Sequence, residues 1–265
     1  MSGILLLLWR RNRAALVMLC AGLFVFQWVI TRLVPGPEQA ELMRNMLNFL
    51  PGPLRATLGD ELLSTLTPRG FLAFAYIHPF VLVMLGVWAV RITAGALAGE
   101  IGQGTMDLLA SRPVSRGAFV ASAATALLVG VGLIALAGFG GSALGLSSRP
   151  VANVRAGMLL PVVAGLWLLF AAFGAVSLLV SALRRRGGNA IAWSAGFMTA
   201  SFALEYVARA WQPIRFLKPL SLFSYYHPQR AIIRGQLGGE DVSVLTAVVV
   251  VSLTLAYLAF RRRDL

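Results

Sequence analysis

Residues 118–146 read AFVASAATALLVGVGLIALAGFGGSALGL, a run without a single charged side chain. A helix needs about 20 apolar residues to cross the hydrocarbon core of a membrane, so this run is long enough to span it. Similar runs lie on both sides, and the whole chain has 58% hydrophobic and only 12% charged residues. A soluble domain carries about 25% charged residues. The sequence therefore predicts a membrane protein.

Apolar runs recur along the whole chain. The run near residue 200 is shorter than the others, and Glu205 interrupts it close to its end. Strands of a transmembrane barrel would be much shorter and would alternate apolar and polar residues. We therefore predict an all-α, polytopic fold in which residues 1–265 form a single transmembrane domain. Its six transmembrane helices cover about residues 14–33, 71–97, 118–146, 156–183, 190–208 and 242–260.

Small residues recur at every fourth position in the third predicted span, at Ala137, Gly141 and Gly145. On a helix such residues share one face, where another helix can approach closely. The pattern predicts tight helix packing and says nothing about the activity of the protein.

The start of the chain differs from a signal peptide, in which positive charge precedes the apolar core. Here Ile4–Trp9 comes first, and Arg10, Arg11 and Arg13 follow. At about 1.5 Å per residue the apolar stretch is too short to cross a bilayer, and arginine is costly in hydrocarbon. We predict a short interfacial helix over residues 4–13 that leads into the first span. The alternative is an extension of that span.

The formal net charge is +13, which in other proteins indicates nucleic-acid binding. Here the arginines gather at the ends of predicted spans, in clusters at residues 10–13, 184–186 and 261–263. Such clusters fit topology and contact with anionic membrane lipid better, with no nucleic acid as partner. Six spans bring all three clusters to one side. We predict a multi-pass protein of the bacterial inner (plasma) membrane with both termini in the cytoplasm.

Two predicted outer segments are long. Residues 34–69 contain several prolines and a stretch, residues 55–66, that fits a short amphipathic helix. Residues 209–241 are too apolar for a free loop and too broken by prolines for a span. Trp and Tyr in this second segment suit the membrane interface. We predict that it forms a re-entrant helical hairpin in the outer leaflet before the last span.

Between the second and third spans lies GEIGQGTMDLLASRPVSRG, residues 99–117, which faces the cytoplasm in this topology. Thr105 and Asp107 favour the start of a short helix, and Pro113 ends it. This helix would present leucine and methionine with a charged fringe. It would serve either as a contact for a partner or as a simple connector on the membrane surface.

The pattern E-x-x-x-G-T-M-D-L-L-A-S-R-P-V-S-R resembles the cytoplasmic coupling segment of the ABC type-2 permease family, the membrane subunits of ATP-driven exporters. Met106 stands where leucine or another aliphatic residue is usual, and Ala123 lies near a position where a basic residue often follows. PLSLFSYYHPQRAIIRG (residues 219–235) and FRRRDL (residues 260–265) resemble the outer segment and terminus of the family. The residues that match the coupling pattern are Glu100, Gly104, Thr105, Asp107, Leu108, Leu109, Pro113, Ser115 and Arg116.

The resemblance implies a permease that is not itself an enzyme. The chain has no G-x-x-x-x-G-K-[ST] phosphate loop and no cofactor is expected, so ATP would be bound by a separate ABC ATPase subunit. It also implies a dimer with a second permease copy or a paralogue. Leu108 and Leu109 would be buried anchors in the ATPase, with Glu100 and Arg112 as charges at the rim. An alternative is a permease-fold scaffold that transmits ATPase movement to an envelope partner without moving cargo.

A few polar residues lie within the predicted spans. Gln27 and His78 would either line a path or bond to neighbouring helices, and Glu205 has Arg209 four residues later, a favourable spacing for an ion pair. Arg91 would extend to the cytoplasmic surface. Two histidines and one cysteine are too few for a metal-handling path, and the spans lack the paired carboxylates or activated nucleophile of a membrane enzyme.

Overall fold

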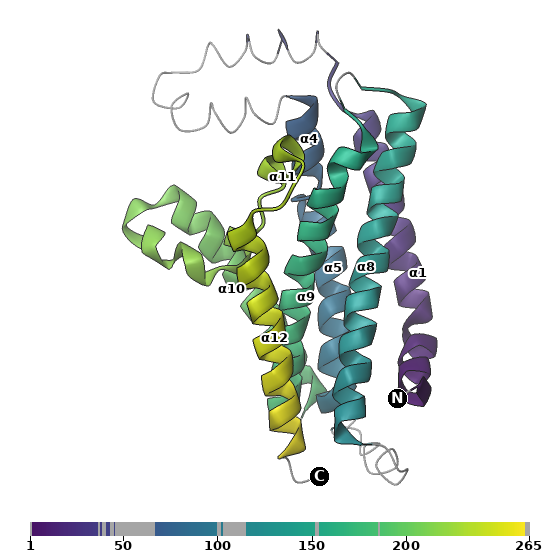
Figure 1. The fold of residues 1–265 in the computed structure, drawn as a ribbon, viewed down its shortest axis with the longest axis vertical. Helices are drawn as coiled ribbons and strands as arrows, with labels where there is room; N and C mark the ends of the chain where they lie inside the picture. Colours follow the sequence, from purple (N-terminus) through teal and green to yellow (C-terminus); the bar gives the residue numbers. More distant parts are fainter. Residues whose placement is uncertain are drawn as a thin grey trace.

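The computed structural model describes most of the chain. The described residues are 2–36, 38, 41–42, 45, 67–99, 102, 115–151, 154–184 and 186–262. Within these ranges every regular element is a helix, as the sequence predicts. Figure 1 shows long helices that run side by side, with the start of the first helix and the end of the last at the same end of the bundle. We call this the terminal end, and the other the loop end.

The described part of the chain forms a bundle of long helices with shorter helices at their ends. Three short helices, η3 (Gln212–Leu220), η4 (Leu222–Tyr225) and α11 (Pro228–Arg234), connect its last two long ones. The others are α1 (Ser2–Arg32), α4 (Pro68–Ala75), α5 (Pro79–Ala94) with the π-helix η1 (Gly95–Gly99), α8 (Arg116–Ser148), η2 (Ala156–Leu159), α9 (Leu160–Leu183), α10 (Gly187–Ala210) and α12 (Gly239–Arg261).

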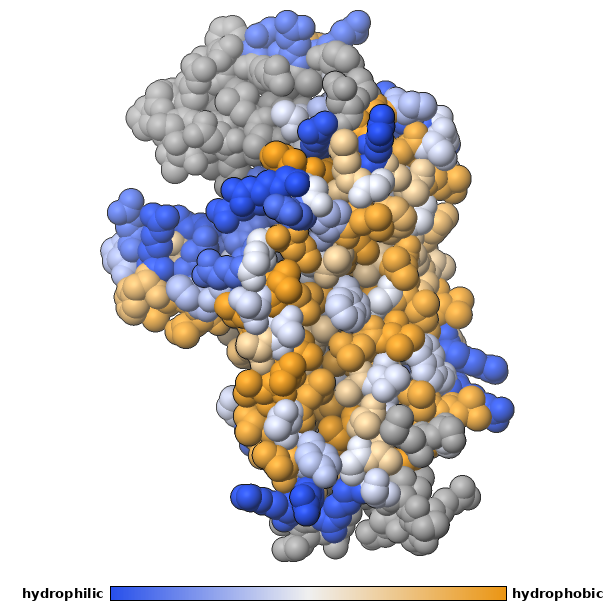
Figure 2. All heavy atoms as spheres, viewed as in Figure 1, coloured by the Kyte–Doolittle hydropathy of each residue, from blue (hydrophilic) through white to orange (hydrophobic). Residues whose placement is uncertain are grey.

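In the described part of the chain, five helical stretches are long and apolar enough to cross a membrane. Figure 2 shows the apolar surface that they give the middle of the bundle, with hydrophilic groups towards both ends. The predicted sixth span coincides with α10, which is less apolar because glycines and polar residues are spread along it. The sixth span stays a prediction. The five stretches are Gly3–Arg32, Pro68–Gly99, Arg116–Ser148, Ala156–Leu183 and Gly239–Arg261.

Residues 4–13 do not form a helix of their own. Helix α1 continues without a break from Ser2 to Arg32, so the predicted interfacial helix and first span are one element. The alternative, an extension of the first span, is the arrangement found. The physical reason is local: no proline or glycine lies between Ile4 and Cys20 to end the helix. The arginines affect where α1 lies in a membrane, but they do not interrupt its backbone hydrogen bonds.

The second predicted span is interrupted near its loop end. Helix α4 ends at Ala75, and α5 begins at Pro79 after a turn. Proline lacks a backbone N–H and favours the first position of a helix, which explains the start of α5. His78 is the N-cap of α5, and its Nδ1 accepts a hydrogen bond from the backbone N–H of Phe80 at 3.3 Å.

Helix α9 is the centre of the bundle and packs against α5, α8, α10 and α12. Helix α1 packs along α8, where the predicted stripe of small residues makes the contact. A β-carbon on Gly141 would lie only 2.1 Å from the carbonyl oxygen of Phe24, and one on Gly145 would lie 2.7 Å from Cβ of Thr31. The predicted close approach at these two glycines is confirmed. Any larger residue there would push α1 away from α8.

The segment around η3 projects sideways from the bundle at the level where α12 begins (Figure 1). We call η3 and η4 together, residues 212–225, the lateral arm. Figure 2 shows hydrophilic groups on one side of this projection and apolar groups on the other. Phe216 and Leu220 are among its most exposed apolar residues, at 76% and 68%. The segment predicted as a re-entrant hairpin is thus a set of three short helices with one apolar side.

Candidate functional site

Most of the predicted coupling residues lie outside the described part of the chain. Of the predicted coupling residues, only Ser115 and Arg116 are described. The π-helix η1, which comes just before the predicted coupling segment, is also described. The predicted helix at residues 55–66 also lies outside. The predicted residues outside are Glu100, Gly104, Thr105, Met106, Asp107, Leu108, Leu109, Arg112 and Pro113.

Residues 100–114 are followed by Ser115 and Arg116, which make contacts with two long helices, α8 and α12. Ser115 is the N-cap of α8, and its hydroxyl accepts a hydrogen bond from the backbone N–H of Ala118 at 3.3 Å. Arg116 donates from Nη1 to the carbonyl oxygen of Arg261, near the end of α12, at 3.2 Å. Ser115 and Arg116 therefore connect the start of α8 to the end of α12.

Residues 100–114 are preceded by the π-helix η1, which is hydrogen-bonded to α9. The Ser181 hydroxyl accepts from the backbone N–H of Ala98 at 3.0 Å and donates to the carbonyl oxygen of Ala94 at 3.1 Å. One turn earlier, Thr93 donates to Ser177 at 2.7 Å. π-Helices are rare and are frequent at functional sites. Here the π-helix joins the second predicted span to the predicted coupling segment.

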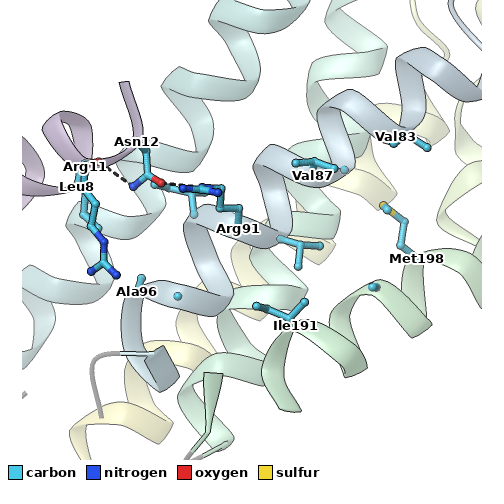
Figure 3. Close-up of a pocket in the computed structure, with 14 residues that line it drawn as sticks. Leu8, Arg11, Asn12, Val83, Val87, Arg91, Ala96, Ile191 and Met198 are labelled. Atoms are coloured by element: carbon cyan, nitrogen blue, oxygen red, sulfur yellow. Dashed lines mark hydrogen bonds between the residues drawn. The ribbon is translucent and has the colours of Figure 1, made fainter. Parts of the chain in front are cut away.

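A groove of about 530 Å³ lies between α1, α5 and α10 near the terminal end (Figure 3). Ile191, Ala195 and Met198 line it from α10, at a spacing that places them on one face of a helix. Val83 and Val87 line it from α5, one turn apart. These side chains give the groove apolar walls. Val83 and Val87 are 58% and 48% exposed, so the groove is open on one side.

The terminal end of the groove is polar. It is lined by Arg11 and Asn12 of α1 and by Arg91 of α5. Nε of Arg91 donates to Oδ1 of Asn12 at 3.0 Å, and Nδ2 of Asn12 donates to the carbonyl oxygen of Leu8 at 2.9 Å. Figure 3 shows Arg91 extending towards Asn12. No carboxylate is among the described residues that line the groove. The groove therefore has apolar walls and two arginines at its terminal end.

A second cavity, of about 150 Å³, continues from the groove towards the loop end. It is lined by Pro79, Phe202 and Phe223, and it shares Val83 and Met198 with the groove. The two cavities lie in line between α5 and α10, with Val83 and Met198 at their junction. The glycine beside that junction, Gly86, leaves space for Met198: an added β-carbon would lie 2.5 Å from its terminal methyl carbon.

Gln27 and His78 do not line either cavity. Gln27 is fully buried, and its Nε2 donates to the carbonyl oxygen of Ala75 at 3.3 Å. Its Oε1 accepts from the hydroxyl of Ser142, which also bonds to the Tyr76 hydroxyl. His78 caps α5 and lies with its ring centroid 5.0 Å from that of Phe26. These contacts favour packing roles for both residues.

Glu205 lies near the loop end of α10 and binds the lateral arm. It is 6% exposed, and its Oε1 accepts from Nε of Arg209 at 2.7 Å, as the sequence spacing predicts. Nζ of Lys218, in η3, lies 3.7 Å from the same oxygen, and the Ser224 hydroxyl, in η4, donates to Oε2. In a second contact, the Ser221 hydroxyl of the arm donates to the carbonyl oxygen of Ser201 in α10 at 2.7 Å. The arm is therefore attached to α10 at two levels.

The sequence alone did not identify the groove. Arg11 belongs to a basic cluster that fits topology, and the hydrogen bond between Arg91 and Asn12 joins residues far apart in the chain. Met198 looks like any other apolar residue of a span. The one available signal was the placement of Arg91 within a long apolar run, where a charged residue indicates function.

Comparison with known protein families gives one match. The family model described as ABC-2 family transporter protein matches residues 39–265, which is most of the chain. A search of curated proteins found no match. The family matched is the one that the 100–116 pattern resembles, and the fold is that of a multi-pass helical membrane protein. The chain therefore belongs to the ABC-2 transporter family and is a membrane component of an ABC transporter system.

Proposed function

We propose that this chain is the permease subunit of an ATP-driven exporter in the bacterial inner membrane, and that the groove between α1, α5 and α10 is part of its substrate path. The observation that carries the proposal is the alignment of the two cavities, which meet at Val83 and Met198. Together they supply a route between α5 and α10 from the terminal end towards the loop end. Membership of a transporter family supports this use of the route.

Energy comes from a separate ABC ATPase subunit in this proposal, because the chain has no phosphate loop of its own. Residues 99–117 contact that subunit, with Leu108 and Leu109 as the buried anchors. The attachments on either side support the role: η1 is bonded to α9, and Arg116 is bonded to the end of α12. Movement of the ATPase would reach three helices at once through these attachments.

The working unit is a dimer, formed with a second copy of the chain or with a paralogue. The open side of the groove supports this, since Val83 and Val87 are exposed in the single chain. A second permease across the path would complete its wall. In this arrangement α10 is the sixth span, the terminal end faces the cytoplasm, and the apolar side of the lateral arm lies in the outer leaflet.

The experiment that tests the path is a block at the junction of the two cavities. Met198→Trp fills the junction, so ATP-driven export should fall at least about tenfold while the ATPase still binds and hydrolyses ATP. Met18→Trp is the matched control, because Met18 of α1 is 66% exposed and lines neither cavity. It should leave export unchanged.

The same experiment separates the exporter from a scaffold that moves no cargo. A scaffold has no use for an open junction, so Met198→Trp would then leave its ATP-driven output on the envelope partner intact. Unchanged output in Met198→Trp, with a folded protein and a bound ATPase, would contradict the proposed path.

A further inference from the structure

The hydroxyl of Ser181 lies between two backbone groups that an α-helix would bond to each other. In an α-helix the backbone N–H of Ala98 would donate to the carbonyl oxygen of Ala94, four residues earlier. Here that N–H donates to Oγ of Ser181 at 3.0 Å, and the same hydroxyl donates to the carbonyl oxygen of Ala94 at 3.1 Å. The serine side chain of α9 thus replaces one α-helical hydrogen bond of the neighbouring span.

This insertion coincides with the change of helix type in the second predicted span. Helix α5 ends at Ala94, and the π-helix η1 occupies Gly95–Gly99. A π-helix has i→i+5 hydrogen bonds, which enclose one residue more than the i→i+4 bonds of an α-helix. A side chain that inserts into the α-helical hydrogen-bond ladder is one cause of such irregular turns. The two hydrogen bonds of Ser181 therefore give a physical reason for the presence of η1.

We infer that Ser181 is a positioning residue, which holds η1 in the π conformation and thereby sets the rotational position at which residues 99–117 meet the ATPase. Without the additional residue in the turn, the chain after η1 would be rotated by about 100°, the angle of one residue in an α-helix. The anchors proposed at Leu108 and Leu109 would then no longer meet their site on the ATPase. The inference rests on the proposed function for the contact between this segment and the ATPase.

Both of these hydrogen bonds of Ser181 are directed away from its own helix. Hydroxyl side chains within helices often bond to a carbonyl oxygen of the preceding turn, as Thr125 does to Ala121 and Thr254 does to Val250. Ser181 instead uses its O–H donor and a lone pair of its oxygen on the backbone of the second span. It is fully buried, so water does not compete for these bonds. The contact between α9 and η1 is therefore a specific one.

The side chains that pack around η1 at this point are small and apolar. Ala94 and Ala98 form a buried cluster with Ala190 of α10. Alanine has no polar side-chain atom, so this cluster supplies no other partner for the N–H of Ala98. Buried backbone groups are almost always paired. Loss of the Ser181 hydroxyl therefore favours a direct hydrogen bond between Ala98 and Ala94, which is the bond of an α-helix.

The test measures this rotation by pulsed electron paramagnetic resonance on the purified, intact chain after Cys20→Ala. One spin label is attached at Gly102→Cys, which is exposed three residues beyond η1. The second is attached at Leu136→Cys of α8 or, in a separate sample, at Val250→Cys of α12, where the native residues are 55% and 56% exposed. Ser181→Ala should change one or both label distances by several ångström. A rotation of about 100° on a radius of about 2.3 Å moves a Cα atom by about 3.5 Å, and a label further from the helix axis by more.

Ser177→Ala is the matched control, because Ser177 lies one turn earlier on α9 and is also buried, but it bonds to the side chain of Thr93 and not to the backbone of η1. It should keep the wild-type distances. Ser181→Thr and Ser181→Val form a second pair of equal shape that differs only in the hydroxyl. The threonine variant should keep the wild-type distances and the valine variant should change them. Thermal melting checks that each variant is folded.

A second measurement uses the complex with the ATPase. Ser181→Ala should bind the ATPase at least about tenfold more weakly, because anchors that are rotated away from their pockets contribute little to binding. Ser177→Ala should bind it as the wild type does. A pull-down at several ATPase concentrations measures the difference.

Two outcomes would overturn the inference. Unchanged label distances in folded Ser181→Ala, or equal distances in the threonine and valine variants, would mean that packing alone maintains η1. Changed distances with wild-type ATPase binding would mean that the rotation does not affect the contact. The distances are measured without the ATPase. A wild type that binds no ATPase would therefore contradict the proposed function, while the distances would still decide whether Ser181 holds η1.

Discussion

Gly99 and Gly187 touch backbone to backbone: a β-carbon placed on Gly187 would lie 3.0 Å from Cα of Gly99. Gly99 ends the π-helix η1, and Gly187 begins α10. The contact thus joins the entrance of the predicted coupling segment to the helix that forms one wall of the groove.

A valine at this contact is expected to reduce transport without loss of ATPase binding. In Gly187→Val the side chain meets backbone, which cannot move aside as a flexible side chain can, so η1 and α10 are pushed apart. Export should fall several-fold while ATPase binding persists. The measurement is ATP hydrolysis and transport by the same reconstituted complex. Gly188→Val is the control, because a β-carbon there meets nothing within 4 Å. Equal transport by both variants would mean that the contact transmits nothing.

The predicted coupling helix can be tested by a charge at one of its anchors. Leu108→Asp should weaken ATPase binding about thirtyfold or more, as expected for loss of a central anchor of about 2 kcal/mol or more. A pull-down of the ATPase measures it, with membrane insertion checked in parallel. The control Leu220→Asp makes the same change on the lateral arm, where the leucine is 68% exposed. If the Leu108→Asp protein inserts and still binds the ATPase normally, residues 99–117 only connect the second and third spans.

The topology can be tested by cysteine labelling from outside the cell after Cys20→Ala. Ser148→Cys, at the loop end of α8, should react with an impermeant maleimide, and Arg186→Cys, just before α10, should react only after the membrane is opened. Both positions are exposed, so protection reports the membrane and not burial. The reverse pattern would place the terminal end outside.

Loss of the Gln27 side-chain hydrogen bonds should destabilise the bundle. Gln27→Leu leaves the carbonyl oxygen of Ala75 without its donor, at the point where α4 ends. An unsatisfied buried polar group costs about 1–3 kcal/mol, and thermal unfolding in detergent measures the loss. Thr254→Val is the control, because the exposed Thr254 bonds only to Val250 in its own helix. An unfolding temperature that matches the control would show that Ala75 finds another donor.

Local pattern was enough to predict part of this structure. The charge-free run at 118–146 predicted the helix α8. The spacing of Gly141 and Gly145 predicted a close approach of another helix, which the structure shows at Phe24 and Thr31. The pair Glu205 and Arg209 follows from helix geometry alone. Each of these depends on residues within one helix or on one face of it.

Features that depend on contacts between distant segments were not predicted. Nothing in the sequence near Arg91 indicates Asn12 as its partner, because the two meet only when α1 packs against α5. The junction at Met198 has the same origin. The continuity of α1 was expected only as the alternative. The cost of arginine in lipid bears on the position of a helix in the membrane, whereas the breaks in a helix are decided by its backbone.

The attachment of the lateral arm to α10 has a mechanical consequence. Glu205 and Ser201 fix η3 and η4 to α10 at two levels, so we expect the arm and the helix to move together as one rigid unit. A helix of this length is about 36 Å long at about 1.5 Å per residue, and η3 adds about 18 Å sideways at about 2 Å per residue. A small rotation where α10 meets η1 would thus move Phe216, beyond the other end of α10, through a larger distance. In the topology proposed above, a fluorophore at that position would report, from outside the cell, on movement at the cytoplasmic end of α10.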